Sequence, residues 1–259
     1  MLTNYLNITS RLLQNPPAPT TLYTTADLTT YINLARGQLA GEARCIRLPL
    51  APISLVLGQR AYNFSSINIG TPSVNGIQGV IHIRRLMYAV GQGYKWLEPR
   101  SSPWFDMYYL NNPVPVPGAP IRWAQYGQGS SGVGSITGVG AGTMASGTFL
   151  IDPIPDATYN LFCDVVCYPQ ALTADTDVEA IPYLWTDAVP YYAAYQALLS
   201  AQTSARMADA ERYLNYYNMF VQRARTAATP DVNKYLYEQS PDPTMLNQMG
   251  LPQGKGAQQ

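Results

Sequence analysis

The chain has 259 residues, only 12% of which are charged, and its 16 acidic side chains balance its 16 basic ones. No net charge therefore draws the protein onto nucleic acid or a membrane surface, which argues against binding to either by bulk electrostatics. The 20 tyrosines, against 5 phenylalanines, favour broad neutral contacts with other proteins, because tyrosine combines an apolar ring with a polar tip.

Signals for secretion, membrane insertion and metal binding are all weak. Met1–Leu13 lacks the basic start and apolar core of a signal peptide, and no window approaches 18 uninterrupted apolar residues. Cys163 and Cys167 lie four residues apart in a predicted strand, roughly 13 Å along it, which is too far for a disulfide. With a single histidine we expect no zinc site, no cofactor, and free thiols in a reducing cytosol.

The first 47 residues predict two helices of a bundle. Met1–Leu13 forms a short helix, and Thr24 or Thr25 caps a longer one. The buried face of the longer helix consists of Leu28, Ile32, Ala35, Leu39, Ala43 and Ile46. Gly37 and Gly41 lie one turn apart on it and leave a bare patch, where we expect another helix to approach closely.

Residues 48–180 predict an inserted antiparallel β-domain, because short apolar runs are separated by proline and glycine at intervals typical of strands. The candidate strands are residues 53–57, 60–64, 79–86, 95–97, 119–124, 147–151 and 159–168. Gly58-Gln59 is interpreted as the turn of a hairpin that joins the first two strands.

Residues 127–147 contain eight glycines between two predicted strands. Gly140–Ala145 matches a loose dinucleotide-binding fingerprint, but no parallel strand precedes it and no helix follows it. We therefore interpret the segment as the long tip of a hairpin, of a kind that often contacts partners.

Residues 181–229 predict an antiparallel helical hairpin that completes the bundle. Its first helix is apolar on every face, so it must be covered on several sides, either by core packing within one subunit or in part by a second subunit. Pro190 removes a backbone hydrogen bond, so this helix either begins near Thr186 or kinks at Pro190. The side chains assigned to packing between subunits are Trp185, Tyr191, Tyr192, Tyr195, Tyr213, Tyr216 and Phe220.

The second helix of the hairpin has apolar residues at alternating steps of three and four, which is a heptad seam. Ser204 is its candidate N-cap, and Thr229-Pro230 ends it. The arginines that could line a channel, or simply form a solvated helix face, are Arg206, Arg212, Arg223 and Arg225.

Residues 230–259 predict an extended C-terminal arm. The segment is rich in Pro, Gln, Asn, Gly and Met and is too poor in apolar residues to fold alone. It is either a plain disordered tail or an arm that becomes ordered on a partner. Its spaced anchor residues are Tyr235, Leu236, Tyr237, Met245, Leu246, Met249 and Leu251.

Catalytic patterns are sparse, and we predict that the protein is not an enzyme. His82 alternates with Ile81 and Ile83 in a predicted strand, where a structural role is expected, and there is no second histidine to support nucleophilic catalysis. The carboxylates available for acid–base chemistry are Asp152, Asp156 and Asp164. Residues 151–156 resemble a turn, however, and no spacing fixes two carboxylates across a cleft.

Several features occur in an order that resembles a known family. A capped helix at Leu28–Arg36 runs into Glu42–Cys45. A Gly-Gln-x-x-Tyr strand follows at Gly58–Tyr62, and then a Gly-Thr-Phe-Leu-Ile-Asp-Pro-Ile-Pro-Asp strand and turn at Gly147–Asp156. A hairpin with Tyr-Tyr-Ala-Ala, opened by Ile181-Pro182, and a tail complete the order. This α+β arrangement, a helical bundle with an inserted antiparallel β-domain and an extended C-terminal arm, resembles the head-to-tail adaptor (connector) proteins of short-tailed bacteriophages.

The resemblance implies a structural virion protein of the neck or tail, assembled in the host cytoplasm. Such adaptors form a ring, usually of twelve copies, beneath the portal vertex. Their helical bundles pack side by side around a channel through which DNA passes without specific binding. The C-terminal arm climbs onto the portal protein, and the β-domain faces outward or toward the tail nozzle and tail fibres. The resemblance assigns no contact to the glycine-rich tip.

Two other classes remain open. A glycan- or receptor-binding β-module of a tail component would need a cluster of exposed aromatic side chains, drawn from Trp96, Trp104, Tyr108, Tyr109 and Trp123. A carboxylate-based hydrolase would need two of the three aspartates named above to face each other across a cleft.

Overall fold

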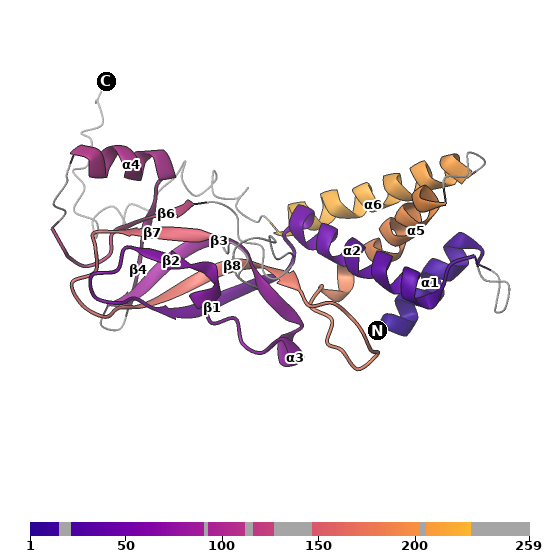
Figure 1. Ribbon diagram of the computed structural model, residues 1–259, viewed down its shortest axis with the longest axis horizontal. Helices are drawn as coiled ribbons and strands as arrows, with labels where there is room; N and C mark the ends of the chain where they lie inside the picture. The colour runs from indigo at the N-terminus through magenta and orange to yellow at the C-terminus, as the bar shows by residue number, and fades with distance from the viewer. Residues whose placement is uncertain (16–21, 91–92, 112–115, 127–146, 202–205, 229–259) are drawn as a thin grey trace, which may run out of the picture.

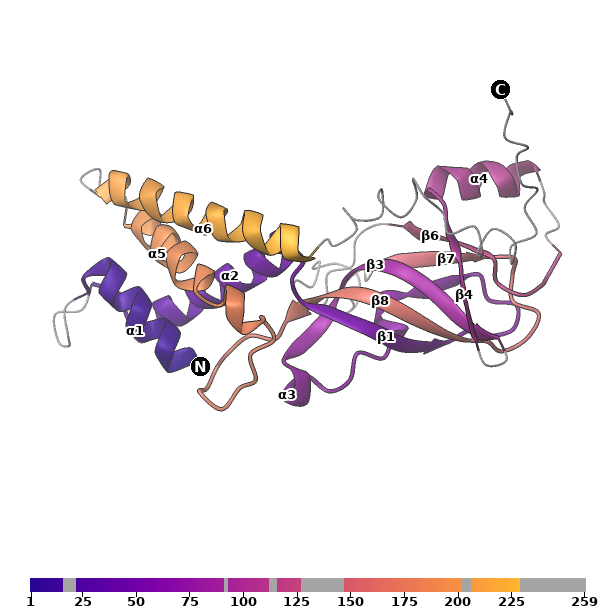
Figure 2. The ribbon, with the colours of Figure 1, turned by 180° about the vertical axis from the view of Figure 1, so that it is seen from behind.

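The protein, seen in a computed structural model, has a bundle of helices at one end and two β-sheets at the other (Figure 1). The view from behind shows the same separation (Figure 2). The structure describes residues 1–15, 22–90, 93–111, 116–126, 147–201 and 206–228. The α+β class predicted from the sequence is confirmed.

Four helices form the bundle, and α5 lies at its centre because it contacts each of the other three. These helices are α1 (Leu2–Leu13), α2 (Thr25–Ala43), α5 (Ala188–Ser200) and α6 (Met207–Ala228). Thr24 caps α2 as predicted: its side chain accepts a hydrogen bond from Asp27 N–H, and the Asp27 carboxylate accepts one from Thr24 N–H. Pro190 lies in the first turn of α5, where the missing N–H costs no helical hydrogen bond, so α5 needs no kink.

The strands form two four-stranded sheets that share one continuous core. The first sheet has the order β1-β8-β3-β4, with all pairs antiparallel. The second has the order β2-β7-β6-β5, and its β5–β6 pair is parallel. The strands are β1 (Arg47–Ser54), β2 (Ala61–Asn63), β3 (Ile77–Val90), β4 (Gly93–Trp96), β5 (Glu98–Pro99), β6 (Arg122–Tyr126), β7 (Thr148–Asp152) and β8 (Asn160–Pro169).

The predicted hairpin turn at Gly58-Gln59 is wrong. β1 pairs with β8 in the first sheet, whereas β2 pairs with β7 in the second. The segment between them therefore crosses from one sheet to the other, held by the Gly58 N–H, which donates to the Pro155 carbonyl at 2.9 Å. Sequence alternation predicted the strands but not which sheet each one joins.

Several short elements were not predicted. They are α3 (Pro72–Asn75), α4 (Ser102–Asn111), β5 and the 3₁₀ turns η1 (Phe64–Ser66) and η2 (Tyr183–Trp185). α4 packs against β6 at the end of the molecule away from the bundle (Figure 1). Its sequence is rich in aromatic residues and has no helical periodicity, which explains why the pattern did not reveal it.

The bare patch on α2 accommodates a strand residue, not the helix that we expected. A Cβ added to Gly37 would lie 2.2 Å from the Tyr168 hydroxyl oxygen and 2.8 Å from its ring carbon Cζ. Tyr168 belongs to β8, so the close approach joins the bundle to the first sheet. A Cβ on Gly41, one turn later, would meet no atom within 4 Å.

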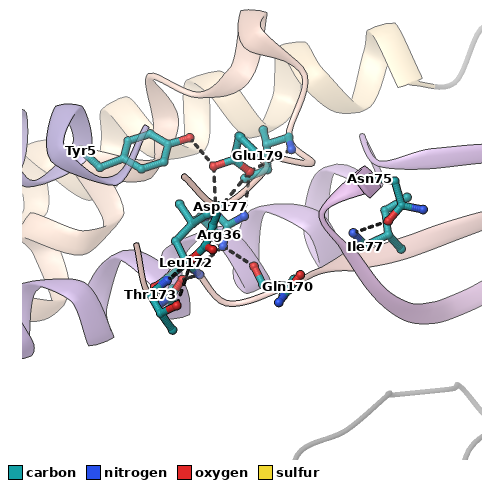
Figure 3. A network of polar contacts seen from close by, with 11 residues as sticks. Tyr5, Arg36, Asn75, Ile77, Gln170, Leu172, Thr173, Asp177 and Glu179 are labelled. Atoms are coloured by element: carbon teal, nitrogen blue, oxygen red, sulfur yellow. Dashed lines mark hydrogen bonds and ion pairs between the residues drawn. The ribbon is translucent and has the colours of Figure 1, made fainter. Parts of the chain in front are cut away.

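A buried ion pair fastens the segment between β8 and η2 to the bundle. Arg36 on α2 is fully buried, and its Nη2 lies 2.8 Å from Glu179 Oε1. Arg36 Nη1 also donates to the carbonyl of Gln170 at 2.6 Å and to Asn33 Oδ1 at 3.1 Å. Tyr5 on α1 donates its hydroxyl to Glu179 Oε2 at 2.9 Å, so three separate parts of the chain converge on this carboxylate (Figure 3).

The remaining hydrogen bonds of this network join side chains to backbone groups. Glu179 Oε1 accepts the Ile181 N–H at 3.0 Å, and Asn33 exchanges two hydrogen bonds with the backbone of Leu172. Burial and the adjacent Glu179 carboxylate raise the pKa of Tyr5 well above its usual value, so its hydroxyl stays a donor. Buried charges are tolerated only when paired and hydrogen-bonded, and both conditions are met here.

Removing one charge from this pair should destabilise the protein strongly. In Glu179→Gln the Arg36 guanidinium stays buried without its counter-ion, at an expected cost of about 3–5 kcal/mol in the free energy of unfolding. Glu98→Gln, which breaks the more exposed pairs with Arg100 and Arg122, is the matched control and should cost at most about 1 kcal/mol. Urea unfolding measures both, and equal costs would contradict the structural role assigned to the buried pair.

The two glycines of α2 should respond oppositely to alanine. Gly41→Ala adds a helix-favouring residue in open space and should stabilise the protein by up to about 1 kcal/mol. Gly37→Ala forces Tyr168 away from α2 and should destabilise it by about 1–3 kcal/mol. Thermal unfolding of the two variants tests this, and stabilisation by Gly37→Ala would show that Tyr168 is not held there.

Candidate interfaces between subunits and with partners

Four aromatic side chains line the contact between α5 and α6, and we call them the aromatic seam: Tyr191, Tyr213, Tyr216 and Phe220. The ring of Tyr191 lies 5.4 Å from that of Tyr216, 6.0 Å from Phe220 and 6.3 Å from Tyr213, measured between centroids. All four side chains are half-buried. The rings of the seam are thus held in place by their contacts with Tyr191, and each ring is still partly exposed on the surface of the subunit.

The other three aromatic residues assigned to packing between subunits have different contacts. Tyr192 packs on the fully buried Tyr217 at 4.6 Å and on Tyr195 at 5.6 Å. Tyr217 in turn donates its hydroxyl to Glu42 Oε2 at 3.0 Å, which joins α6 to α2. Trp185 is half-buried against the main core. Trp185, Tyr192 and Tyr195 thus pack within the subunit and are also half-exposed, so their role between subunits stays a prediction.

Much of the cover of α5 comes from the same chain. α5 packs against α1, α2 and α6, and its small residues Ala193, Ala194 and Ala197 are fully buried. α6 also reaches α1, because the Tyr213 hydroxyl donates to the Leu12 carbonyl at 2.8 Å. The aromatic seam is one part of the hairpin surface that stays half-exposed, and its role between subunits stays a prediction.

The four arginines proposed to line a channel do not share one face of α6. Arg212 lies over the ring of Tyr216, with its Cζ 5.6 Å from the centroid, and Arg223 is exposed. Arg225 donates from Nε to the Glu42 carbonyl at 3.1 Å and so lies against α2. Arg206 is half-buried and precedes the helix. Their role in a channel stays a prediction.

The arm at residues 230–259, with its seven anchor residues, lies outside the described residues, as do most of the glycine-rich tip and Ser204. The flanks of the tip are described: β6 and β7 pair antiparallel from Arg122–Asp152 to Tyr126–Thr148, as the predicted hairpin requires. The arm and the tip therefore remain predictions from sequence.

The aromatic residues considered for glycan binding do not form one exposed platform. Trp123 is buried at 5% exposure. Trp104 on α4 stacks on Tyr108 at 5.0 Å and lies under the guanidinium groups of Arg100 and Arg122 at 5.4 and 5.3 Å. Trp96 is exposed but belongs to β4 of the first sheet, and the Tyr109 side chain lies outside the described part of the chain. The geometry therefore does not favour a glycan site.

The aspartates considered for a hydrolase each have a separate structural partner. Asp152 is buried, and its Oδ2 lies 3.3 Å from Arg122 Nη1. Asp164 Oδ2 lies 3.4 Å from Arg84 Nη1, and Asp156 Oδ1 accepts the Tyr159 hydroxyl at 2.6 Å. Asp152 and Asp164 also belong to different sheets. Their surroundings are those of fold-stabilising carboxylates.

The thiols and the described helices add no further candidate site. Burial raises the pKa of Cys163 and Cys167 to about 12 and that of Cys45 to about 11, so all three stay protonated and unreactive. Within the described ranges, no group of three or more His, Cys, Asp and Glu side chains could hold a metal ion. Among the same residues, no helix combines the length and apolar character that crossing a membrane would need.

Comparison with known protein families identifies the family of this chain. A model of the SU10 adaptor protein family matches residues 3–237, which include both sheets and nearly the whole bundle. Comparison with the curated proteins gave no match. The resemblance to bacteriophage adaptors is confirmed by this match. The chain belongs to the SU10 adaptor protein family and is a structural adaptor of a bacteriophage virion that takes part in tail assembly.

Proposed function

We propose that copies of this chain form a ring, of twelve subunits, that joins the portal protein to the tail and continues the DNA channel. The observation that carries the proposal is the aromatic seam, four rings fixed by mutual contact and left half-exposed on adjacent helices. Membership of an adaptor family supplies the context, because an adaptor must contact both portal and tail components.

The aromatic seam has the properties of an interface core. Tyrosine is enriched at protein interfaces because it offers a large rigid area and a polar tip at small entropic cost. The seam rings already contact one another, so docking requires little further ordering of side chains. A ring needs contacts between two different surfaces of each subunit, and the seam would supply one of them.

A channel lined by α6 would present few charges to DNA. Residues of an α-helix turn by about 100° each, so Arg212 and Arg223 lie about 20° apart, whereas Arg225 lies about 200° from Arg223. Only the first two would therefore face the lumen together. Few arginines per subunit limit counterion release, which lets DNA pass without tight binding.

The arm at residues 230–259 would attach the ring to the portal protein, and the β-domain would face the tail nozzle and possible fibre proteins. The arm begins directly after α6, at the end of the bundle that borders the sheets (Figure 1). Its spaced apolar residues suit an extended segment that docks on a preformed surface.

Loss of one seam ring should weaken ring assembly more than it affects the subunit fold. Tyr216→Ser removes a half-exposed aromatic from the proposed interface. A hot-spot loss of about 2 kcal/mol would raise the protein concentration needed for half-assembly by about thirtyfold. Native mass measurement over a concentration series tests this, with circular dichroism as the check on folding.

Tyr183→Ser is the matched control for this variant, because Tyr183 is 84% exposed and lies outside the seam. It should assemble like the parent protein. If Tyr216→Ser assembles equally well, the seam is not the subunit interface.

Deletion of residues 231–259 should separate portal attachment from subunit assembly. The shortened protein should keep its fold and its ring, because the described core contains none of the deleted residues. Its binding to purified portal rings should be lost, as measured by mass analysis of the mixture. Undiminished portal binding would show that the arm is not the attachment segment.

A further inference from the structure

A hollow lies where the bundle meets the first sheet. Two adjoining cavities of about 280 and 360 Å³ share Gly41, Glu42 and Arg44 as lining residues. β3 adds Ile81 and His82 to the first, and the last turn of α6 adds Arg225 to the second. We call this hollow the Arg44 pocket.

The Arg44 pocket has free space beside α2 because Gly41 has no side chain to fill it. A Cβ on Gly41 would meet no atom within 4 Å, so the helix backbone borders free space. Arg44 follows α2 directly as its C-cap residue in the left-handed region, with φ of 53°. This geometry turns the chain away from the helix and leaves the guanidinium at the edge of the pocket.

The pocket carries more positive than negative charge. Glu42 is its one acidic lining residue among the described residues, and its carboxylate oxygens already accept from the Tyr217 hydroxyl and from Gln38 Nε2. Arg44 forms no hydrogen bond or ion pair from its guanidinium with the described residues. Arg225 lies against α2 through its bond to the Glu42 carbonyl, so Arg44 is the cation on which the pocket's recognition of an anion would depend.

His82 is a neutral wall residue of the same pocket. Burial, together with the positive charges of Arg44, Arg84 and Arg47, lowers the pKa of His82 to about 4. Its imidazole is therefore uncharged near neutral pH and can donate one hydrogen bond.

We propose that the Arg44 pocket binds an acidic side chain, Asp or Glu, of a protein partner in the assembled virion. The Arg44 guanidinium would pair with both carboxylate oxygens, the geometry for which arginine is suited, and the neutral imidazole of His82 would donate to the same group. The proposal rests on the proposed function, since the partner is another protein of the neck or a second copy of this chain.

A protein carboxylate fits better than DNA. The pocket is half-enclosed and has the volume for one or two side chains, whereas a duplex presents a row of phosphates along an extended surface. The chain as a whole has no net charge that would hold a duplex there. The acidic residue of the pocket, Glu42, already accepts hydrogen bonds from Tyr217 and Gln38. A carboxylate of a partner would therefore supply the acceptor for Arg44.

His82 is the one histidine in the sequence, so its imidazole proton resonances report on this pocket alone. The experiment titrates the full-length, tag-free protein with acetyl-Gly-Glu-Glu-Gly-amide and follows His82 by proton NMR. We expect a saturable shift and a rise in the pKa of His82, because a nearby negative charge stabilises the protonated imidazole. The Gln-for-Glu peptide is the ligand control and should produce no saturable shift.

Variants of the pocket separate binding from folding. Arg44→Gln should weaken the peptide response at least about tenfold, the loss of one charge-assisted pair. Gly41→Leu should abolish the response by filling the cavity, whereas the distant Arg212→Gln should keep it. The proposal is overturned if Arg44→Gln responds like the parent, or if the Gln peptide shifts His82 equally.

Two further titrations distinguish the sources of the anion. Inorganic phosphate should shift His82 only weakly, and a response to phosphate without one to the acidic peptide would mean an adventitious anion site. A stronger response to a short DNA duplex than to the peptide would replace the protein partner by nucleic acid and overturn the proposal. The readout is the resonance of His82 and not the mass of an assembly, so failure here and failure to form a ring are seen separately.

Discussion

The ion pair between Arg36 and Glu179 is the contact on which the arrangement of the rest depends. The segment that returns from the sheets to the bundle has no regular secondary structure between β8 and η2, so backbone pairing cannot place it. The buried guanidinium places it instead, by binding a carboxylate and a carbonyl of that segment at once. Tyr5 adds α1 to the same carboxylate. Because a buried charge without its partner is costly, one relative placement of these elements is favoured strongly over others.

This placement decides which apolar surface remains for other proteins. With α1 and α2 fixed against α5, the central helix is covered by its own chain, and its alanines allow the close packing that this requires. The larger aromatic side chains at the α5–α6 contact cannot be buried in the same way, since they project beyond the alanine-lined centre. They lie on one another and stay half-exposed. The bundle is therefore covered largely by its own chain and leaves these aromatic side chains half-exposed, which is the surface that we propose for assembly.

Where the bundle meets the first sheet, the two glycines of α2 have different surroundings. At Gly37 the absence of a side chain admits Tyr168 and brings α2 close to the first sheet, whereas at Gly41 the same absence leaves space. The space is lined by Arg44 and His82, which come from different elements and lie near each other because α2 packs on β8, the neighbour of β3 in the first sheet.

The sequence by itself determined the α+β class, the capped helix from Thr25, most strands and the adaptor resemblance, because these depend on local periodicity, turn residues and motif order. It could not determine that β1 and β2 join different sheets, that Gly37 faces a strand, or that α5 is covered within one subunit. Those features depend on contacts between residues far apart in the chain. It also gave no sign of the pairing of Arg36 with Glu179, or of Arg44 with His82 at one pocket. A charged residue in a helix looks the same in sequence whether it is solvated or buried, and only the tertiary structure supplies the partner that decides which.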